Sequence, residues 1–542
     1  MSQKLACSLP QRFLRMCRRN LRRSKVADSA GADLTGASLL TRTLVLRRLL
    51  VRHVLAKDEQ YVGVLLPPSA AAVVSNAALA LDRRISVNLN YTASAKAIDD
   101  ANARCGIRHV LTSRRMVERL SFRVDADLVY LEDLQGKVSW KDKVIAGAMT
   151  WLTPVALLEW WFALTRVQPD DVLTVIFTSG TTGDPKGVML THRNVGANID
   201  ALDEILGLRD DDVLMAILPF FHSFGYTGTL WTILSMNPKG VYHYNPIDAR
   251  QIGHLCRQHR GTILVATPTF LRPYLKRCQA EDFATLEVVF VGAERLPTAL
   301  ADAFEEKFGV RPYEGYGATE LSPVAAGNVP PSRGPGAARQ GARSGTVGRP
   351  LPGVEAKVVD LATGADLGTE EPGMLLIRGP NVMKGYLEQP EATATVIRDG
   401  WYVTGDMAMI DADGFIRITD RLSRFSKVGG EMVPHLGVEE AIQKVLADTG
   451  DVRPLAVTGI PDSKKGERLI VVHTGLGQPV AQVVKELAHA GLPPLWIPSP
   501  DSFVQVDELP LLGTGKLDLR KLRQIAVERS VDAAAPRCGS GS

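Results

Sequence analysis

The chain has 542 residues, of which 45% are hydrophobic and 23% are charged. This length exceeds what one hydrophobic core supports, so we expect two or three domains. The formal net charge is only +4, which excludes a strongly basic nucleic-acid-binding protein. Six cysteines are scattered without a Cys-x-x-Cys pair, which predicts a reducing, cytoplasmic compartment and no structural zinc.

Residues 1–25 carry eight Lys and Arg residues and no acid. Leu9, Phe13, Cys17 and Leu21 recur at intervals of four residues, which predicts a basic amphipathic helix. Two interpretations stay open. The helix packs on its own domain with a solvated basic face, or it makes peripheral contact with the anionic inner face of a membrane.

From residue 34 to residue 111, apolar strands alternate with helical periods. The expected elements are a helix over 41–55, a strand over 61–66, a helix over 70–81, a strand over 85–89, a helix over 94–103 and a strand over 108–111. Strand, helix and strand at this spacing predict a parallel α/β sheet.

The window 144–164, VIAGAMTWLTPVALLEWWFAL, comes closest to a membrane span. Because it contains Pro154 and Glu159, it predicts a buried or interfacial helical segment rather than a membrane span. We expect core packing for the three tryptophans of this window.

A strand over 173–177 then leads into a loop rich in hydroxyls and glycines. The loop reads Thr178-Ser179-Gly180-Thr181-Thr182-Gly183, followed by Asp184-Pro185-Lys186-Gly187. Glycines let backbone N–H groups approach an anion closely, the hydroxyls add donors and Lys186 adds a positive charge. The pattern predicts a phosphate-binding loop. It is not the Walker loop, because Pro185 stands five residues after Gly180, where that pattern has glycine.

This loop resembles the signature loop of the acyl-adenylate-forming enzymes, which include acyl-CoA synthetases, luciferases and the adenylation domains of peptide synthetases. Later segments extend the resemblance. They are Gly292-Ala293-Glu294, the run Tyr313-Glu314-Gly315-Tyr316-Gly317-Ala318-Thr319-Glu320, the run Gly400-Trp401-Tyr402-Val403-Thr404-Gly405-Asp406, the pair Asp420-Arg421 and the turn Gly513-Thr514-Gly515-Lys516.

The resemblance implies that ATP and Mg²⁺ bind at these motifs. The turn Gly292-Ala293-Glu294 would lie against adenine and ribose, and Tyr316 would stack on the adenine while Gly317 allows the backbone to approach. Thr319 would donate to the α-phosphate. Glu320 would hold magnesium, which favours one or two carboxylates together with phosphate oxygens.

The same resemblance assigns the remaining nucleotide contacts and the catalytic side chains. Thr182 and its loop would hold the β- and γ-phosphates, and Asp406 and Arg421 would bind the ribose. Lys516 would bridge the substrate carboxylate and the α-phosphate. The small C-terminal domain would then swing about a hinge at Ser423, so that Lys427 supports transfer to a thiol of CoA or of an acyl-carrier-protein phosphopantetheine arm.

Aromatic residues follow a strand over 213–218 and predict the wall of an acyl pocket, with His222, Phe224 and Tyr226 as its candidates. Members of the family that activate amino acids place an aspartate here. None stands between Asp212 and Asp248, so a fatty acid is favoured over an amino acid.

Two positions depart from the family pattern: the hinge residue is Ser423 rather than Asp or Lys, and Met432 stands near a position where many relatives have arginine. The run Gly430-Glu431-Met432-Val433 resembles the acyl-carrier-protein synthetase half of the bifunctional 2-acylglycerophosphoethanolamine acyltransferase/acyl-carrier-protein synthetase. The alternative is a non-catalytic nucleotide- or lipid-binding scaffold.

The expected fold class is α/β. We predict a large N-terminal multi-layer domain over 1–420, with a β-rich subdomain over 345–420. A small mobile α+β domain over 421–532 and a disordered tail over 533–542 follow.

Overall fold

The computed structural model describes residues 7–120, 123–178, 185–333, 341–421, 424–429, 431–447, 454–462, 465–490, 492–511 and 517–534. The chain divides into two compact units. The first unit is Met1–Ala356, Leu376–Val403 and Gly414–Ile416, and the second is Lys357–Leu375, Thr404–Asp413 and Arg417–Ser542. The domain boundary predicted at residue 420 stays a prediction.

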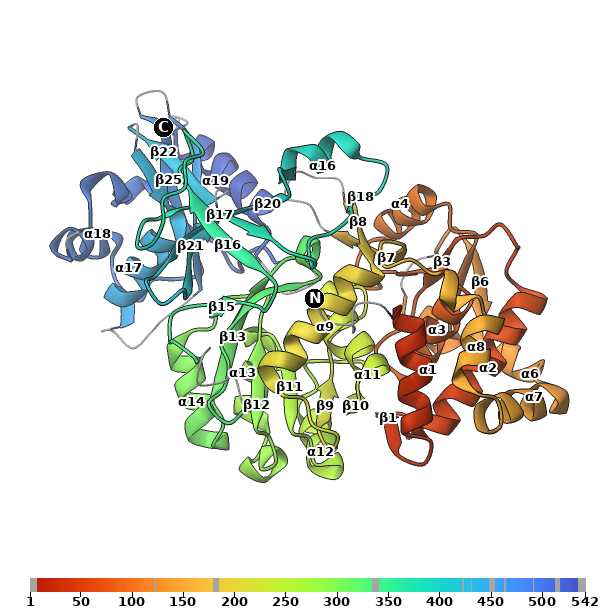
Figure 1. The fold of residues 1–542 in the computed structure, drawn as a ribbon. Helices are drawn as coiled ribbons and strands as arrows, with labels where there is room; N and C mark the ends of the chain where they lie inside the picture. The colour runs from red at the N-terminus through yellow and green to blue at the C-terminus, as the bar shows by residue number, and fades with distance from the viewer. Residues whose placement is uncertain are drawn as a thin grey trace, which may run out of the picture. The chain divides into compact units, whose positions relative to one another are not determined.

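A largely parallel sheet forms one half of the first unit (Figure 1). Its order is β15 (Arg349–Pro350), β14 (Val324–Gly327), β13 (Pro312–Gly317), β12 (Val288–Val291), β11 (Ile263–Ala266), β9 (Val213–Ala216), β10 (Lys239–Tyr242), β1 (Ser24–Asp28) and β2 (Asp33–Thr35). Neighbouring strands from β13 to β1 are parallel. Central strands such as β11 and β12 are apolar and buried throughout, because helices cover both faces of such a sheet.

A second sheet forms the other half of this unit. Its order is β18 (Gly385–Tyr386), β8 (Lys186–Thr191), β7 (Val172–Thr178), β4 (Ile85–Asn88), β3 (Tyr61–Val64), β5 (His109–Thr112) and β6 (Asp127–Tyr130). Strands β7, β4, β3, β5 and β6 are parallel, which confirms the parallel sheet predicted from the alternating pattern. Strands β8 and β18 are added antiparallel at one edge.

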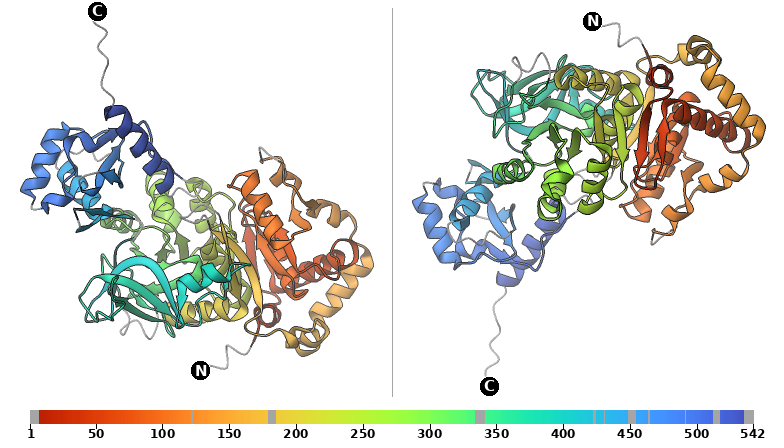
Figure 2. Two further views of the ribbon diagram at one scale, coloured as in Figure 1. Left: turned by 90° about the horizontal axis from the view of Figure 1, so that it is seen from above. Right: turned by 90° about the horizontal axis from the view of Figure 1, so that it is seen from below.

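Helices cover both sheets (Figures 1 and 2). Those of the first unit are α1 (Leu9–Arg19), α2 (Gly36–His53), α3 (Ala70–Leu81), α4 (Ala95–Cys105), α5 (Arg114–Val117), α6 (Leu131–Gly136), α7 (Trp140–Trp151), α8 (Val155–Trp161), η2 (Leu164–Arg166), α9 (His192–Leu206), α10 (Ser223–Gly225), η3 (Tyr226–Trp231), α11 (Thr232–Ser235), α12 (Ala249–His259), α13 (Pro268–Arg277), η4 (Ala280–Phe283), α14 (Thr298–Phe308), η5 (Thr319–Leu321) and α16 (Pro390–Val396). Helix α3 begins where Ser69 accepts a hydrogen bond from the amide of Ala72, so its start follows from a capping residue.

Two further sheets contain the later strands. The third runs β16 (Glu355–Val359), β17 (Gly373–Arg378), β20 (Trp401–Ile410) and β19 (Ile397–Arg398), with β21 (Ile416–Arg421) beside β20. The fourth belongs to the second unit and runs β23 (Glu431–Pro434), β22 (Phe425–Val428), β25 (Gly466–His473) and β24 (Leu455–Asp462), with β26 (Phe503–Gln505) beside β25. The helices of the second unit are α17 (His435–Ala447), α18 (Val480–His489), η7 (Pro494–Trp496), η8 (Pro500–Ser502) and α19 (Leu519–Ala534).

The N-terminal basic helix is part of the first unit's core. Leu9, Phe13 and Cys17 of α1 are buried, so its apolar face is not available to a bilayer. Two of its arginines form ion pairs within the unit: Arg12 with Asp200 at 2.8 Å, and Arg15 with Glu159 of α8 at 2.7 Å. Of the two interpretations, the structure supports packing on its own domain.

The core packing expected for the tryptophans of residues 144–164 is wrong. Trp151 is 48% exposed, Trp160 is 68% exposed and Trp161 is 60% exposed. The helical prediction is confirmed by α7 and α8. Across the described ranges, no helix combines the length and the apolar character needed to traverse a bilayer.

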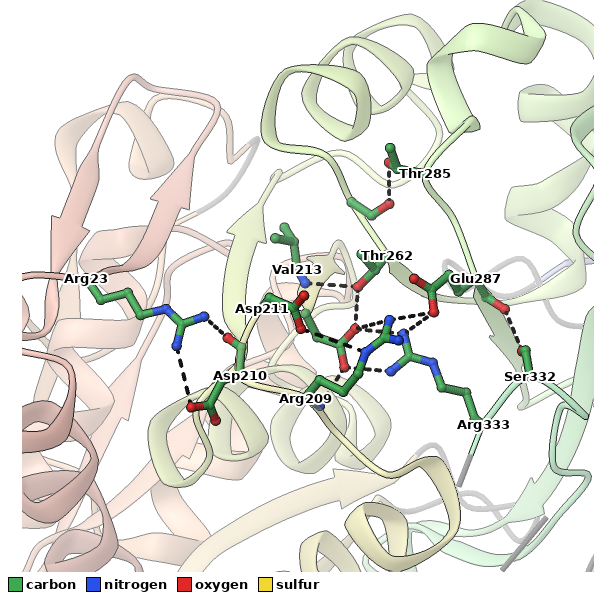
Figure 3. A network of polar contacts seen from close by, with 12 residues as sticks. Arg23, Arg209, Asp210, Asp211, Val213, Thr262, Thr285, Glu287, Ser332 and Arg333 are labelled. Carbon is green, nitrogen blue, oxygen red and sulfur yellow. Dashed lines mark hydrogen bonds and ion pairs between the residues drawn. The ribbon is translucent and has the colours of Figure 1, made fainter. Parts of the chain in front are cut away.

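A buried ion-pair network joins the start of β9 to a loop far along the chain (Figure 3). The guanidinium of Arg333 donates two hydrogen bonds to Asp212, at 2.7 and 2.8 Å, and the two side chains are only 2% and 0% exposed. The hydroxyl of Thr262 also donates to Asp212, at 2.7 Å. Glu287 pairs with Arg333 at 3.0 Å and with Arg209 at 2.5 Å, and Arg209 also lies 3.8 Å from the exposed Asp211, so the cluster has two cations and three anions.

The pKa of Asp212 reflects this network. Burial alone would raise it, but the hydrogen bonds from Arg333, from the Arg209 amide and from Thr262 hold the pKa below its usual value. A carboxyl whose pKa is depressed by folding contributes stability above its unfolded pKa, and that contribution is lost as the pH falls through the folded pKa.

We therefore predict that Asp212→Asn lowers the free energy of unfolding of the first unit by about 3 kcal/mol at pH 7, since Arg333 stays buried beside a neutral amide. Urea denaturation measures this free energy of unfolding. The difference from the wild type should shrink below about pH 4, the unfolded pKa of aspartate.

The matched control is Asp211→Asn, because Asp211 is the neighbouring residue but is 83% exposed. Its effect should stay within about 0.5 kcal/mol. A small loss for Asp212→Asn, or a loss that does not change with pH, would contradict the stabilising role of this ion pair.

Candidate functional site

Candidate residues gather at the carboxyl ends of the parallel strands in the first unit. Thr178 ends β7, Gly292 follows β12, and Gly317 ends β13. His222 stands shortly after β9. In open α/β sheets, ligands bind outside the carboxyl ends of the strands, so the topology selects this edge.

The phosphate-loop candidate lies between two paired strands. Thr178 at the end of β7 is the register partner of Lys186 at the start of β8. The residues between them, with candidates Ser179, Gly180, Thr181, Thr182 and Gly183, lie outside the described residues. Thr178 and Lys186 therefore mark the two ends of the loop, and both are partly exposed.

Tyr386 connects the cationic and the acidic candidates. Strand β18 pairs with β8, with Tyr386 opposite Val188, so the Tyr386 ring lies 4.8 Å from the ammonium of Lys186. The Tyr386 hydroxyl donates to Oε1 of Glu320 at 2.8 Å. Burial and the nearby charge of Glu320 raise the pKa of Tyr386, so this hydroxyl keeps its proton and remains a donor.

Thr319, which precedes Glu320 in η5, also has a hydroxyl partner. Ser223 in α10 donates to the hydroxyl of Thr319 at 3.4 Å, and the amide of Met383 donates to the backbone oxygen of Glu320 at 2.8 Å. The short helix η5 is thus held from two sides, by the segment after β9 and by the segment before β18. We call Lys186, Ser223, Thr319, Glu320 and Tyr386 the polar cluster.

The chemistry of the polar cluster fits a metal–polyphosphate. Lys186 supplies a positive charge, Thr319 a hydroxyl donor and Glu320 a carboxylate. No group of three His, Cys, Asp or Glu side chains suited to a metal occurs in the part of the chain that the structure describes. A magnesium ion here would use Glu320 together with phosphate oxygens, which is the way Mg²⁺ is held in many nucleotide sites.

Backbone conformation restricts which residues can stand at the carboxyl ends of β12 and β13. A Cβ at Gly317 would lie 1.9 Å from the carbonyl oxygen of Pro323, so this position admits only glycine without rearrangement. Ala293 has φ +69°, in the left-handed region that L-residues rarely occupy. Strain of this kind is often found at functional sites.

The Gly292-Ala293-Glu294 turn lies beside the aromatic candidates. A Cβ at Gly292 would lie 3.4 Å from the ring of Phe224, which shows that the two are in contact. The side chain of Glu294 accepts from the amide and the hydroxyl of Thr269, at 3.3 and 2.6 Å, so it caps the start of α13. The predicted contacts of this turn with adenine and ribose stay predictions.

The three pocket candidates have different environments. His222 and Phe224 are partly exposed, and Phe224 packs edge-to-face on Phe290. Tyr226 is fully buried, and its hydroxyl is 3.2 Å from that of Ser86, so its side chain belongs to the core of the first unit. The role of all three as a pocket wall stays a prediction.

A cavity of about 210 Å³ is lined in part by Tyr313 and Glu314, the first two residues of the run from Tyr313 to Glu320. Leu296, Glu314, Asn328 and Arg343 are among its lining residues. Burial raises the pKa of Glu314 to about 7, against the opposing effects of the Leu296 amide and Arg295. A carboxyl with this pKa is about half protonated at neutral pH, and its protonated form can donate as well as accept a hydrogen bond.

The remaining candidates belong to the second unit. Asp406 on β20 is 5% exposed. Lys427 on β22 is exposed and is the register partner of Met432 on β23. Arg421 ends β21, but its side chain is not among those described; Ser423 and Lys516 lie outside the described residues. Their roles stay predictions.

A sequence model of the AMP-binding enzyme family matches residues 13–387, a range that contains the whole polar cluster. The chain belongs to this family. The resemblance inferred from the loop and from the tyrosine–glycine motif is thereby confirmed at the level of the family.

Named relatives of this AMP-binding enzyme include two acid–CoA ligases. A long-chain-fatty-acid–CoA ligase of Bacillus subtilis (strain 168) is 30% identical over 373 residues, which cover 67% of this chain and 63% of the ligase. The 4-coumarate–CoA ligase 1 of Solanum tuberosum is 36% identical over 310 residues, which cover 56% of this chain and 55% of the ligase. The chain thus matches less than two thirds of the length of either relative.

The fold extends over nearly the whole chain. The crystal structure of ATP-bound MatB from Rhodopseudomonas palustris matches with a TM-score of 0.77 at 27% identity, covering 95% of this chain and 98% of that one. This confirms the predicted fold class, with a large N-terminal α/β domain and a smaller C-terminal α+β domain. The more specific resemblance to an acyl-carrier-protein synthetase stays a prediction.

Sequence reasoning missed three residues that the structure places at or beside the site. Tyr386 stands in the turn Met383-Lys384-Gly385-Tyr386, so a signal for it was present. Ser223 lies within the aromatic run and gave no signal of its own. Glu314 precedes the tyrosine–glycine motif, but only its burial reveals the raised pKa.

We predict that Tyr386→Phe weakens nucleotide binding through magnesium. The change keeps the ring beside Lys186 but removes the hydrogen bond to Glu320, so the carboxylate loses its orientation. The Mg²⁺ concentration for half-maximal binding of a fluorescent ATP analogue should rise about tenfold, the value expected for a hydrogen bond to a charged group.

Tyr130→Phe is the matched control. The Tyr130 ring also lies beside a cation, with the Arg114 guanidinium 4.6 Å away, but on the distant strand β6. The Tyr130→Phe variant should leave the Mg²⁺ dependence of nucleotide binding unchanged. Equal behaviour of the two variants would show that the Tyr386 hydroxyl does not position Glu320 for a metal.

Proposed function

We propose that this AMP-binding enzyme is an ATP-dependent acid–thiol ligase. It activates a fatty acid as acyl-AMP and transfers the acyl group to a phosphopantetheine thiol, either of CoA or of an acyl carrier protein. The observation that carries this proposal is the polar cluster, in which Tyr386 joins the carboxylate of Glu320 to Lys186, at one end of the glycine-rich loop, and the hydroxyl of Thr319 stands next to Glu320.

Activation requires two anions to meet. A carboxylate is a poor electrophile, and its repulsion from a triphosphate must be compensated by fixed positive charge. One oxygen of the acid forms a bond to the α-phosphorus, the bond from that phosphorus to the bridging oxygen breaks, and pyrophosphate leaves. Lys186 and Mg²⁺ held by Glu320 would neutralise the β- and γ-phosphates, while Thr319 would donate to the α-phosphate.

Lys516 would stabilise the charge that develops between the carboxylate and the α-phosphate in this first step. In the second step, the thiol attacks the carbonyl carbon, its proton passes to solvent, and AMP leaves. Movement of the C-terminal domain at Ser423 would remove Lys516 and bring Lys427 to the adenylate. The exposure of Lys427 on β22 is compatible with a residue that acts in only one of two arrangements.

The substrate is an acid with an apolar body. Half-buried aromatic groups at His222 and Phe224, and the lack of an aspartate between Asp212 and Asp248, support a fatty acid over an amino acid. The names of the two ligases above, one for a long-chain fatty acid and one for 4-coumarate, support a fatty or aromatic acid and CoA as the acceptor.

The test is ATP–pyrophosphate exchange with fatty acids of short to long chain and with 4-coumarate. We expect exchange with at least one fatty acid, and thioester formation when CoA or phosphopantetheinylated carrier protein is added. No exchange with any acid would contradict the proposal and favour the non-catalytic scaffold suggested by Ser423 and Met432.

Two lysine variants separate the half-reactions. Lys516→Ala should lower exchange by about a hundredfold or more, since a preorganised charge is lost, but keep thiolysis of added acyl-AMP. Lys427→Ala should keep exchange and slow thioester formation. Lys444→Ala, at an exposed lysine of α17, is the control for both. Equal loss of both half-reactions in either variant would contradict the division of roles.

A further inference from the structure

Helix α7 turns polar and small side chains toward the protein and large apolar ones outward, which is the reverse of an ordinary surface helix. Asp142, Ala146 and Thr150 recur at intervals of four residues and are buried, and this stripe packs toward α2. The opposite stripe contains Trp140, which is 69% exposed, and Trp151, which is 48% exposed. A helix in water normally turns its apolar stripe inward, so something other than water is expected to cover this one.

Helix α8 also exposes tryptophans. Only three residues separate it from α7, and it presents Trp160 and Trp161 at 68% and 60% exposure. Both helices lie at the margin of the first unit, α7 against α2 and α8 against α1 (Figures 1 and 2). We define the tryptophan face as Trp140, Val144, Trp151, Leu152, Trp160 and Trp161.

The acidic groups of these helices face inward and are neutralised. Asp142 is 0% exposed and pairs with Arg52 at 2.9 Å and with Arg48 at 3.2 Å. The side chain of Glu159 is 7% exposed and pairs with Arg15 at 2.7 Å. These ion pairs fix which side of α7 and α8 faces the protein, so the tryptophans are held outward by the folded structure.

The outward charges are all positive. Residues 137–161 contain no acids other than Asp142 and Glu159, and their exposed ionisable groups are Lys137, Lys141 and Lys143. The preceding acids on α6, Glu132 and Asp133, accept hydrogen bonds from the backbone and side chain of Arg114. The tryptophan face is therefore apolar and aromatic with a basic margin.

We propose that the tryptophan face binds the surface of an anionic lipid bilayer, with α7 and α8 lying in the headgroup region. Tryptophan prefers this region, because its ring is apolar and its indole N–H can reach polar groups. Lysines beside an apolar helix face are attracted to anionic headgroups. No described helix could span the bilayer, so the contact is peripheral.

A second copy of the chain fits this face less well. In a two-fold symmetric dimer, the same patch of both chains lies at one interface, so the lysines of both copies would come together there without an exposed acid from residues 137–161. Lysine is also depleted in the core of protein interfaces. The proposal does not depend on the ligase activity, because it concerns a surface that the polar cluster does not include.

Co-flotation of the full chain with vesicles tests the proposal. Vesicles of phosphatidylcholine with 30% phosphatidylglycerol should carry the wild type upward, and vesicles of phosphatidylcholine alone should carry much less. The double variants Trp140→Ser/Trp151→Ser and Trp160→Ser/Trp161→Ser should each lower the partition coefficient by about tenfold or more, since each removes two large apolar groups. The control Ile247→Ser/Leu361→Ser changes apolar residues that are 55% and 47% exposed elsewhere and should bind as the wild type does.

The charge contribution is tested separately. Lys137→Glu/Lys141→Glu/Lys143→Glu should abolish the preference for phosphatidylglycerol, and raised salt should weaken wild-type binding in the same direction. The proposal is overturned if the wild type fails to float with anionic vesicles, or if it floats and the tryptophan variants float equally. Sedimentation velocity without lipid identifies the competing occupant: a dimer that the tryptophan variants lose, without vesicle binding, would assign the face to self-association.

Discussion

The hydrogen bond from Tyr386 to Glu320 is the constraint on which the site depends. It joins two segments that are 66 residues apart, and it can form only because the short strand β18 is added to the edge strand β8. The same pairing places the Tyr386 ring beside Lys186. One tyrosine thus fixes the relation between the cation at the end of the glycine-rich loop and the carboxylate in η5.

The two sheets of the first unit position different residues of the site. The second sheet carries the loop and Lys186 through the β7–β8 pairing, and the first sheet presents Gly292 and Gly317 at the carboxyl ends of β12 and β13. At the opposite end of β9, the buried pair Asp212–Arg333 anchors the strand that leads to Ser223. The ion pair therefore stabilises the amino end of β9, while the strained Ala293 and the sterically restricted Gly317 lie at the carboxyl ends of β12 and β13.

Much of this arrangement follows from local patterns in the sequence. The helix predicted over 70–81 agrees with α3 because Ser69 is a strong cap and the helix is buried on all sides. The motif Tyr316-Gly317-Ala318-Thr319-Glu320 predicts a nucleotide site through its resemblance to the family, and the family match over residues 13–387 includes it. The roles of its individual residues stay predictions. The ion pair of Arg333 and the outward tryptophans of α7 could not be predicted, because their partners Asp212, Arg48 and Arg52 come from distant segments and leave no periodic signal.

We expect the polar cluster to hold a metal–polyphosphate, with the metal on Glu320. The most direct measurement is the anomalous diffraction of crystals grown with ATP and Mn²⁺ in place of Mg²⁺. We expect an anomalous peak within direct coordination distance of a Glu320 carboxylate oxygen, next to phosphate oxygens that approach Lys186. A nucleotide bound with its metal away from Glu320, or with its phosphates away from the loop that ends at Lys186, would contradict it.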